Sequence, residues 1–163
     1  MNLHSMNKME KWEAAVDNID WRLMRDEVDR ALIENLAAEL GFPDFDRLER
    51  ASELVVDDFY ITHLSDGRWA WWNPRRYANE DPTYFGDDQS LKEFIIQFLQ
   101  LDQVGSKQLE EGLSKVVQMN RCKFCEHEYD PIELQERQPD INHSDYCSTE
   151  CAMESILGEI KEE

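Results

Sequence analysis

All four cysteines of this 163-residue chain lie in its C-terminal third, where they form two close pairs. Cys122 and Cys125 have two residues between them, Cys147 and Cys151 have three, and 21 residues separate the pairs. Thiolates at short spacings on two chain segments can surround a zinc ion as a tetrahedron. The residues after Cys151 predict a helix, so the second pair would share one helical face near an N-terminus that favours negative charge. The pattern therefore predicts a zinc site.

Disulfides and a redox-active pair are the alternative uses of these cysteines. Disulfides need an oxidising compartment, whereas the first eight residues lack the apolar segment of a secretory signal, so we expect a cytoplasmic protein. A redox Cys-x-x-Cys would leave the second pair without a role. His127 and His143 are spare ligands, which we expect to be solvated or hydrogen-bonded because four cysteines already complete the site. Such a closed site is structural rather than catalytic.

Residues 119–160 resemble a treble-clef zinc finger, and the run Tyr-Cys-Ser-x-x-Cys at 146–151 is similar to small bacterial and viral fingers of that group. The resemblance implies a zinc knuckle at the first cysteine pair, a β-hairpin between the pairs, and a helix that donates the last two ligands. Glu126 stands where these fingers usually have glycine, and Pro131 and Pro139 predict an irregular hairpin. Treble clefs serve many functions, so the resemblance predicts a fold rather than an activity.

The composition predicts a folded but strongly acidic protein. A hydrophobic content of 41% can form a core, and no apolar run approaches the ~20 residues of a membrane span. Seventeen basic and 36 acidic residues give a net charge of −19, well beyond the about 2–8 units typical of a small domain. Residues 122–163 hold 3 of the basic and 12 of the acidic residues. Because nucleic-acid affinity depends on Lys and Arg contacts to phosphate, this charge excludes direct nucleic-acid binding.

Two helices are predicted in the first third of the chain. After Asp20, apolar residues recur at spacings of three and four up to residue 40, and Gly41 and Pro43 end that helix. Asp44 can cap a second helix, whose apolar residues are Phe45, Leu48, Ala51 and Val55. We expect these two helices to form a helical hairpin.

A β-hairpin is predicted at residues 59–72, where two β-rich runs flank a Ser-Asp-Gly turn. With Asp-Gly as a two-residue loop, Thr62 would pair with Trp71 and Ile61 with Trp72. Both faces are apolar, so either helices cover both or one face contacts a partner. We expect the aromatics and His63 to be core residues; the alternative is an exposed binding patch formed by Trp69, Trp71 and Trp72.

Residues 73–89 form a long stretch without periodicity, which includes Arg75, Arg76 and Tyr77. Such a stretch is either a recognition loop or an ordered connection held by its own aromatics. Ser90 begins a capping box and an apolar stripe, so a helix is predicted from there to Gly105. A further helix, from Ser106 to residue 120, would lead directly into the first cysteine pair.

The sequence therefore predicts an α+β protein: a mainly helical body with one β-hairpin at residues 1–120, and a treble-clef-like zinc module at 121–163 packed on it. We expect no enzyme, because the chain lacks a phosphate-binding glycine loop and zinc would occupy every cysteine. The acidic pairs at 57–58 and 87–88 are weak candidates for a Mg²⁺ site.

The expected function is protein–protein binding, as a regulator or adaptor, through Trp69, Trp71, Trp72, Arg75, Arg76 and Tyr77. A sharper version is an inhibitor whose carboxylates mimic nucleic acid and occupy the basic groove of a nucleic-acid-binding protein. By composition alone the chain resembles acidic phage-encoded inhibitors, which would act in the host cytoplasm. The alternatives are a structural component of a larger assembly and a metal-dependent enzyme.

Overall fold

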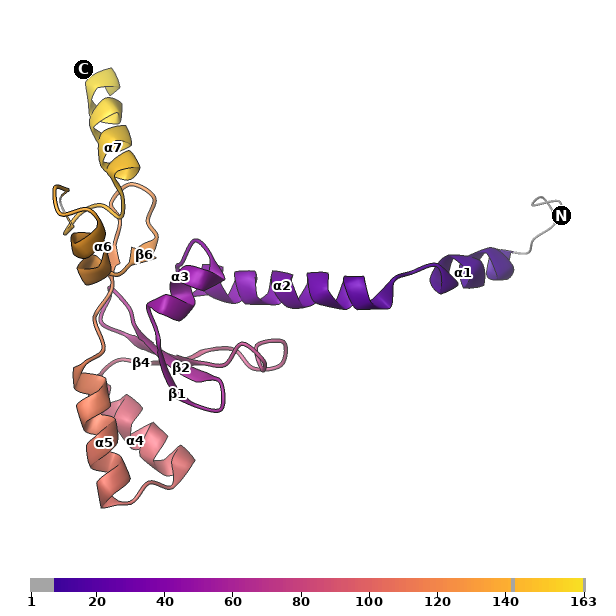
Figure 1. Ribbon diagram of the computed structural model, residues 1–163, viewed down its shortest axis with the longest axis horizontal. Coiled ribbons are helices and arrows are strands. Elements are labelled where there is room, and N and C mark those ends of the chain that lie inside the picture. The colour runs from indigo at the N-terminus through magenta and orange to yellow at the C-terminus, as the bar shows by residue number, and fades with distance from the viewer. Residues whose placement is uncertain (1–7, 142, 163) are drawn as a thin grey trace.

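The computed structural model describes residues 8–141 and 143–162. Residues 1–7, most of the segment in which we sought a secretory signal, lie outside this range. Figure 1 shows a compact body from which two helical segments project. In chain order the elements are α1 (Lys8–Asp17), α2 (Trp21–Glu39), α3 (Phe45–Arg50), β1 (Glu53–Val56), β2 (Phe59–His63), β3 (Trp69–Trp72), β4 (Thr83–Phe85), α4 (Asp88–Leu99), α5 (Gln103–Ser114), β5 (Asn120–Arg121), β6 (Glu128–Tyr129), α6 (Pro131–Arg137) and α7 (Thr149–Glu162).

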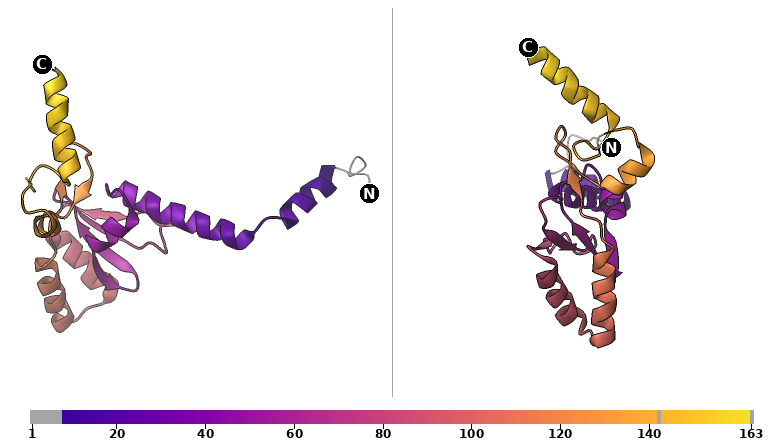
Figure 2. Two further views of the ribbon diagram at one scale, coloured as in Figure 1. Left: turned by 45° about the horizontal axis from the view of Figure 1, so that its top comes forward. Right: turned by 90° about the vertical axis from the view of Figure 1, so that its left-hand side faces the viewer.

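A four-stranded antiparallel sheet, in the order β1-β2-β3-β4, forms the middle layer of the body. One face packs against α3 and the C-terminal end of α2, around Leu36, Leu48 and Trp72. The other packs against α4 and α5 (Figure 2), around Trp71, Ile95 and Leu113 among others. Helices thus cover both faces of the predicted hairpin, and the α+β fold class is confirmed.

The hairpin register differs by one residue from the predicted one. Ile61 pairs with Trp71 and His63 with Trp69, so the loop has three residues instead of two. Gly67 ends this loop with φ +89°, the left-handed residue that three-residue hairpin loops use. In this register Trp69 and Trp71 share a face with Ile61 and His63 rather than with Thr62, while Trp72 lies on the other face with Tyr60.

The predicted second helix is wrong beyond residue 50. Helix α3 ends at Arg50, and Val55 lies on strand β1, which pairs with β2. Asp57 and Asp58 form the connecting turn, both with positive φ (44° and 65°), as a two-residue turn between twisted strands requires. The body is therefore a four-stranded sheet with helices rather than a helical body with one hairpin.

The predicted connections between residues 73 and 120 are also corrected. Residues 83–85 form strand β4 on the edge of β3, so the irregular segment is shorter than expected. Asp87, not Ser90, caps α4, and Gln100 ends it in a left-handed conformation (φ 52°). Gly105 lies inside the first turn of α5, where its N–H donates to the capping carboxylate of Asp102 at 2.8 Å. Helix α5 ends at Ser114, and an extended segment leads to the cysteines.

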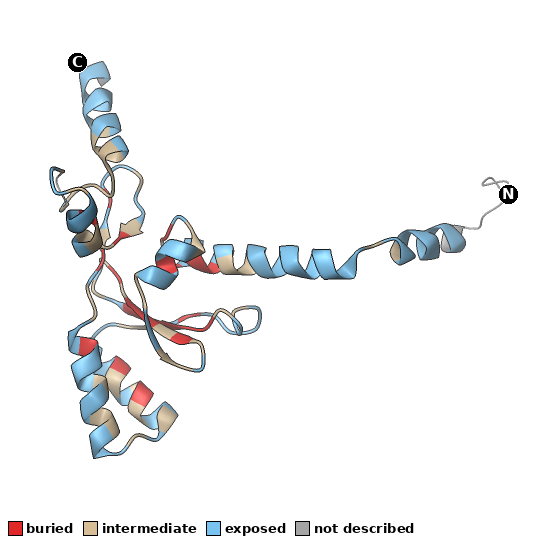
Figure 3. Ribbon diagram, in the orientation of Figure 1, coloured by how far each residue is buried: buried red, intermediate tan, exposed pale blue. Residues whose placement is uncertain are grey.

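Two helices extend away from the body (Figure 1), and most of their length is exposed (Figure 3). Their exposed side chains include apolar ones such as Met24 and Ile156. Residues 21–31 of α2 are all exposed, whereas Leu36 and Leu40 near its other end are buried. Helix α7 leaves the cysteine-containing module in a different direction, and its residues 156–161 are also exposed. Among residues 8–141 and 143–162, no helix combines the length and apolar character that crossing a bilayer requires.

Hydrogen bonds join the cysteine-containing segment to the body. The N–H of Glu128 donates to the carbonyl of Gly41 at 2.8 Å, and its carboxylate accepts from the N–H and hydroxyl of Ser65 at 3.2 and 2.6 Å. Upstream, the N–H of Met119 donates to the carbonyl of His63 at 2.9 Å. These contacts hold the segment against the hairpin loop and the end of α2.

Candidate metal centre

The first cysteine pair lies in the tight turn between β5 and β6. The N–H of Cys122 donates to the carbonyl of His127 at 3.0 Å, and the N–H of Glu126 donates to the carbonyl of Cys122 at 3.0 Å. Glu126 has a φ of 62°, the left-handed conformation that favours glycine, the residue that the treble-clef resemblance leads one to expect at this position. The turn brings the two sulfur atoms to the same side.

The second pair lies at the start of α7. The hydroxyl of Ser148, which lies between the two cysteines in the sequence, accepts a hydrogen bond from the N–H of Cys151 at 3.1 Å. Ser148 therefore caps the N-terminus of α7. Cys147 precedes this cap and Cys151 lies in the first turn. Lys123, between the first two cysteines, connects that turn to the residues just before Cys147. Its N–H donates to the carbonyl of Asp145 at 2.8 Å, and its ammonium contacts the Asp145 carboxylate at 2.7 Å.

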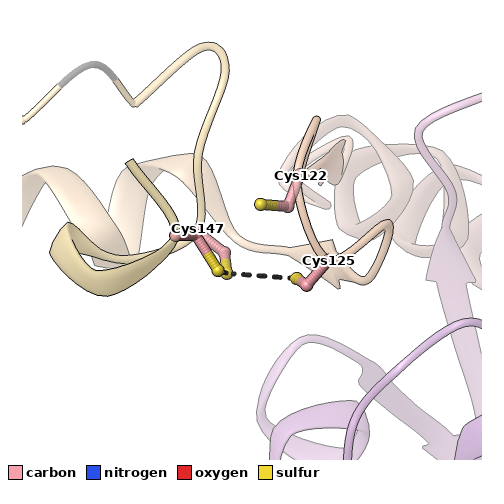
Figure 4. A group of neighbouring side chains, drawn as sticks. Cys122, Cys125 and Cys147 are labelled. Carbon is pink, nitrogen blue, oxygen red and sulfur yellow. Dashed lines mark hydrogen bonds between the residues drawn. The ribbon is translucent and has the colours of Figure 1, made fainter. Parts of the chain in front are cut away.

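The four sulfur atoms lie within 4.8 Å of one another. Figure 4 shows Cys122 and Cys125 facing Cys147, and the Sγ of Cys147 lies 3.5 Å from that of Cys125 and 3.6 Å from that of Cys151. A tetrahedron with Zn–S bonds of about 2.3 Å has S–S edges of about 3.8 Å. All four cysteines are free, and these separations far exceed the about 2.05 Å of a disulfide bond. Four cysteines thus form a cluster that can hold a metal ion.

Electrostatics in the cluster favour a cation. Burial opposes ionisation of Cys122, but backbone N–H groups of Cys125, Cys147 and Phe124 outweigh it and lower the pKa of Cys122 to about 7. Burial raises the pKa of Cys125, and burial together with the adjacent sulfur atoms raises the pKa of Cys147. The negative charge of one thiolate thus opposes ionisation of the neighbouring thiols. The positive charge of a divalent cation would offset this repulsion and allow all four cysteines to ionise.

The protein around the cluster differs in part from the treble-clef expectation. A knuckle and a helix contribute the two cysteine pairs, as expected, but the short helix α6 lies in the middle of the region where a hairpin was predicted. Tyr129 and Leu134 pack beside Cys122, which is 1% exposed. His127 is exposed, and the ring of His143 bonds the carbonyl of Gln138 at 2.7 Å, so neither histidine belongs to the cluster.

A cavity of about 460 Å³ opens between α3 and the cysteine cluster, and Cys125, Cys147 and Cys151 contribute to its wall. Arg50 on α3 and Arg137 on α6 also line it, and both pair with Glu133, at 3.0 and 3.6 Å. The wall also includes Arg47 and the carboxylates of Glu128, Asp130 and Glu150, so it carries charges of both signs. Sequence reasoning missed it, because α3 and α6 are far apart in the chain.

The residues proposed as a partner-binding surface separate into two groups. Trp69, Trp71 and Trp72 are 5%, 4% and 2% exposed and belong to the two cores, so they form no exposed patch. Arg75 and Arg76 are exposed on the loop after β3. The half-buried Tyr77 donates a hydrogen bond to Glu39 on α2, which raises the pKa of Tyr77 to about 12.

The acidic pairs considered for Mg²⁺ have structural roles. Asp58 contacts Arg75 at 3.0 Å, within the tight β1–β2 turn. The carboxylate of Asp87 caps α4 and accepts a hydrogen bond from the N–H of Ser90 at 2.7 Å, and this hydrogen bond lowers the pKa of Asp87. Neither pair belongs to a metal-binding cluster of the described residues.

Comparison of the chain with protein-family models, with curated proteins and with solved structures found no match. The site's own geometry therefore provides the basis for a functional proposal.

Proposed function

We propose that this chain is a small acidic zinc-binding protein that functions by binding another protein, as an adaptor or regulator. Zinc is the proposed metal because four thiolates at tetrahedral spacing suit a soft or borderline ion. Four thiolates leave no position for water or substrate, which supports a structural rather than an enzymatic role. We infer a reducing compartment such as the cytoplasm, since the ligands are free cysteines.

The observation that carries this proposal is an apolar stripe on α7. It has the i, i+3, i+4, i+7 spacing of one helix face, and its members are 49–64% exposed: Met153, Ile156, Leu157 and Ile160. Contiguous exposed apolar surface of this kind marks protein contacts. Because Cys151 lies in the first turn of the same helix, a bound metal would fix the direction in which the stripe points. The proposed structural metal thereby positions the proposed binding surface.

Charge defines the kind of partner. The same helix carries Glu150, Glu154 and Glu159, and residues 122–163 have 12 acidic residues against 3 basic ones. We therefore propose a partner whose apolar contact surface is bordered by Lys and Arg. Such complementarity accelerates association and selects against acidic partners.

The test is affinity capture from an extract of the source organism with two matched variants of α7. Replacing Ile156 and Ile160 together with serine should abolish capture, whereas Lys161→Ser, at an exposed position of α7 outside both the stripe and the acidic set, should preserve it. Metal content, measured by mass spectrometry, should equal that of the wild type in both variants. Equal capture by both variants would refute binding through the α7 stripe.

A second candidate function is mimicry of nucleic-acid charge, which the net charge of −19 favours. The same capture experiment separates the two candidates. A partner held by carboxylates alone would dissociate at high salt and be displaced by added DNA. A partner held by the apolar stripe would withstand both treatments.

A further inference from the structure

A second, smaller cavity lies among the loop after β3, the sheet and α4, and shares no residue with the cavity beside the cysteines. Its volume is about 180 Å³, below the roughly 300–1,000 Å³ of sites for drug-sized molecules, so it suits a single side chain. Aromatic rings form much of its wall, and we call it the aromatic pocket; the residues that matter here are Phe59, Trp71, Arg76, Glu80, Asp81 and Phe98.

Three aromatic rings form a corner of the pocket beside two carboxylates. Phe59 and Trp71 stack with centroids 4.7 Å apart at 13°, and Phe98 stands edge-on to both, at 5.3 and 5.6 Å. Phe98 is 47% exposed, so this corner is open to solvent at one side. Aromatic faces attract cations, and the carboxylates of Glu80 and Asp81 add negative charge to the same wall.

The chain's own Arg76 already makes such a contact. Its guanidinium lies 5.2 Å from the Phe59 centroid, and its Nη1 lies 3.6 Å from Oε1 of Glu80. The side chain is still 55% exposed, and the ion pair is long, so one ring and one distant carboxylate hold it. Neighbouring Arg75 instead pairs with Asp58 at 3.0 Å.

We propose that the aromatic pocket receives an arginine side chain of a protein partner, which displaces Arg76. The inference rests on the proposed function, because it specifies part of the partner's chemistry. Arginine suits the pocket better than lysine, since its planar, weakly hydrated guanidinium stacks on rings and forms paired hydrogen bonds to carboxylates. Arg76 then acts as an internal competitor that fills the pocket of the free protein.

The direct test is an NMR titration of the full ¹⁵N-labelled chain with the peptide acetyl-Gly-Arg-Gly-amide. Signals of Phe59, Phe98 and the Trp71 indole should shift. A matched peptide with citrulline, which keeps the shape but has no charge, should produce no such shifts. Equal shifts with citrulline, or stronger binding of the lysine peptide, would overturn the proposal.

Variants test the competition. Arg76→Ala should strengthen peptide binding about two- to fivefold, because the internal competitor is removed. Arg75→Ala makes the same change in net charge one residue away and should leave the affinity unchanged. Equal strengthening in both variants would show a general charge effect and refute the exchange. Phe98→Leu, at a half-exposed position, should weaken binding about two- to fivefold; an unchanged affinity would argue against the rings as the receptor.

This titration and the capture experiment on α7 fail independently. The peptide contacts only the aromatic pocket. If the Ile156/Ile160 variant loses partner capture but binds the peptide normally, the pocket proposal is supported independently of the α7 stripe. Capture that persists while the peptide fails to bind would refute the pocket alone.

Discussion

The indole N–H of Trp72 donates a hydrogen bond to the buried hydroxyl of Thr62 at 2.9 Å. The Thr62 hydroxyl lies 2.6 Å from that of Ser52, which in turn donates to the carbonyl of Leu48 at 2.6 Å. This chain of hydrogen bonds crosses from β3 through β2 to the end of α3. It gives every polar group along it a partner inside an otherwise apolar core, and it fixes the sheet against the helix.

Thr62→Val should destabilise the protein by about 1–3 kcal/mol, because the Trp72 indole N–H would remain buried without its acceptor. Valine has nearly the same shape, so the loss measures the hydrogen bonds rather than packing. Urea unfolding followed by tryptophan fluorescence gives the free energy of unfolding. Thr83→Val, at an exposed position of β4, is the control and should change it by less than about 0.5 kcal/mol. Similar losses of stability in both variants would contradict a stabilising role for these buried hydrogen bonds.

Two Gly→Ala substitutions should have opposite effects on stability. An added Cβ meets no atom within 4 Å at either Gly67 or Gly112, so only the backbone conformation matters. Gly67 has a φ of +89°, and alanine there should cost about 1–2 kcal/mol. Gly112 lies in α5, where alanine should stabilise the helix by about 0.5–1 kcal/mol. Thermal melts of both variants test the signs, and a stabilising Gly67→Ala would contradict the hairpin loop described above.

Metal removal should unfold the cysteine-containing module and leave the sheet intact. The proposed metal, bound by the four thiolates, would hold the knuckle to α7, whereas the two main cores contain no cysteine. Cys147→Ala should lower the bound metal from one ion per chain to a small fraction, with loss of helical signal. Ser148→Ala removes only the helix cap, costs about 1 kcal/mol, and should retain the metal. A chain that stays fully folded without metal would refute the structural role.

Stability should depend on the protonation of His63. The His63 ring stacks on Trp69 at a centroid distance of 3.9 Å, and its burial lowers the His63 pKa below the ordinary 6.5. Between that lowered pKa and 6.5 the unfolded chain binds more protons than the folded one, so stability falls as the pH drops below 6.5. Wild type should therefore lose stability relative to His63→Gln between pH 7.5 and 5.5, as measured by urea unfolding. A difference that is constant with pH would contradict this.

Local sequence signals predicted the cysteine cluster and several helix ends correctly. The spacing of Cys147 and Cys151 already places both sulfur atoms at a helix start. Helix α2 begins directly after Asp20, and Asp44 caps α3, as expected. The errors involve tertiary pairing. Strand β1 was missed because residues 45–55 have helical spacing and because two aspartates in a positive-φ turn are an uncommon signal.

The exposed surfaces lay beyond sequence reasoning for a similar reason. Met153 and Ile156 have the spacing of an ordinary core-facing helix, and only the arrangement in space shows that no described part of the chain covers them. The aromatic pocket depends on Phe59 and Phe98, which are 39 positions apart in the sequence. The sequence around either residue therefore does not predict that the two rings meet.

Helix α2 carries a stripe of its own, formed by Trp21, Met24 and Val28, which are 44–57% exposed. Because α2 and α7 leave the body in different directions (Figure 1), a molecule bound along one would not block the other. If the proposed partner binding extends to both helices, two partners on one molecule would be held at a raised local concentration, set by the distance between the two helices. Valency, rather than the strength of either contact, would then determine how firmly the three components stay together.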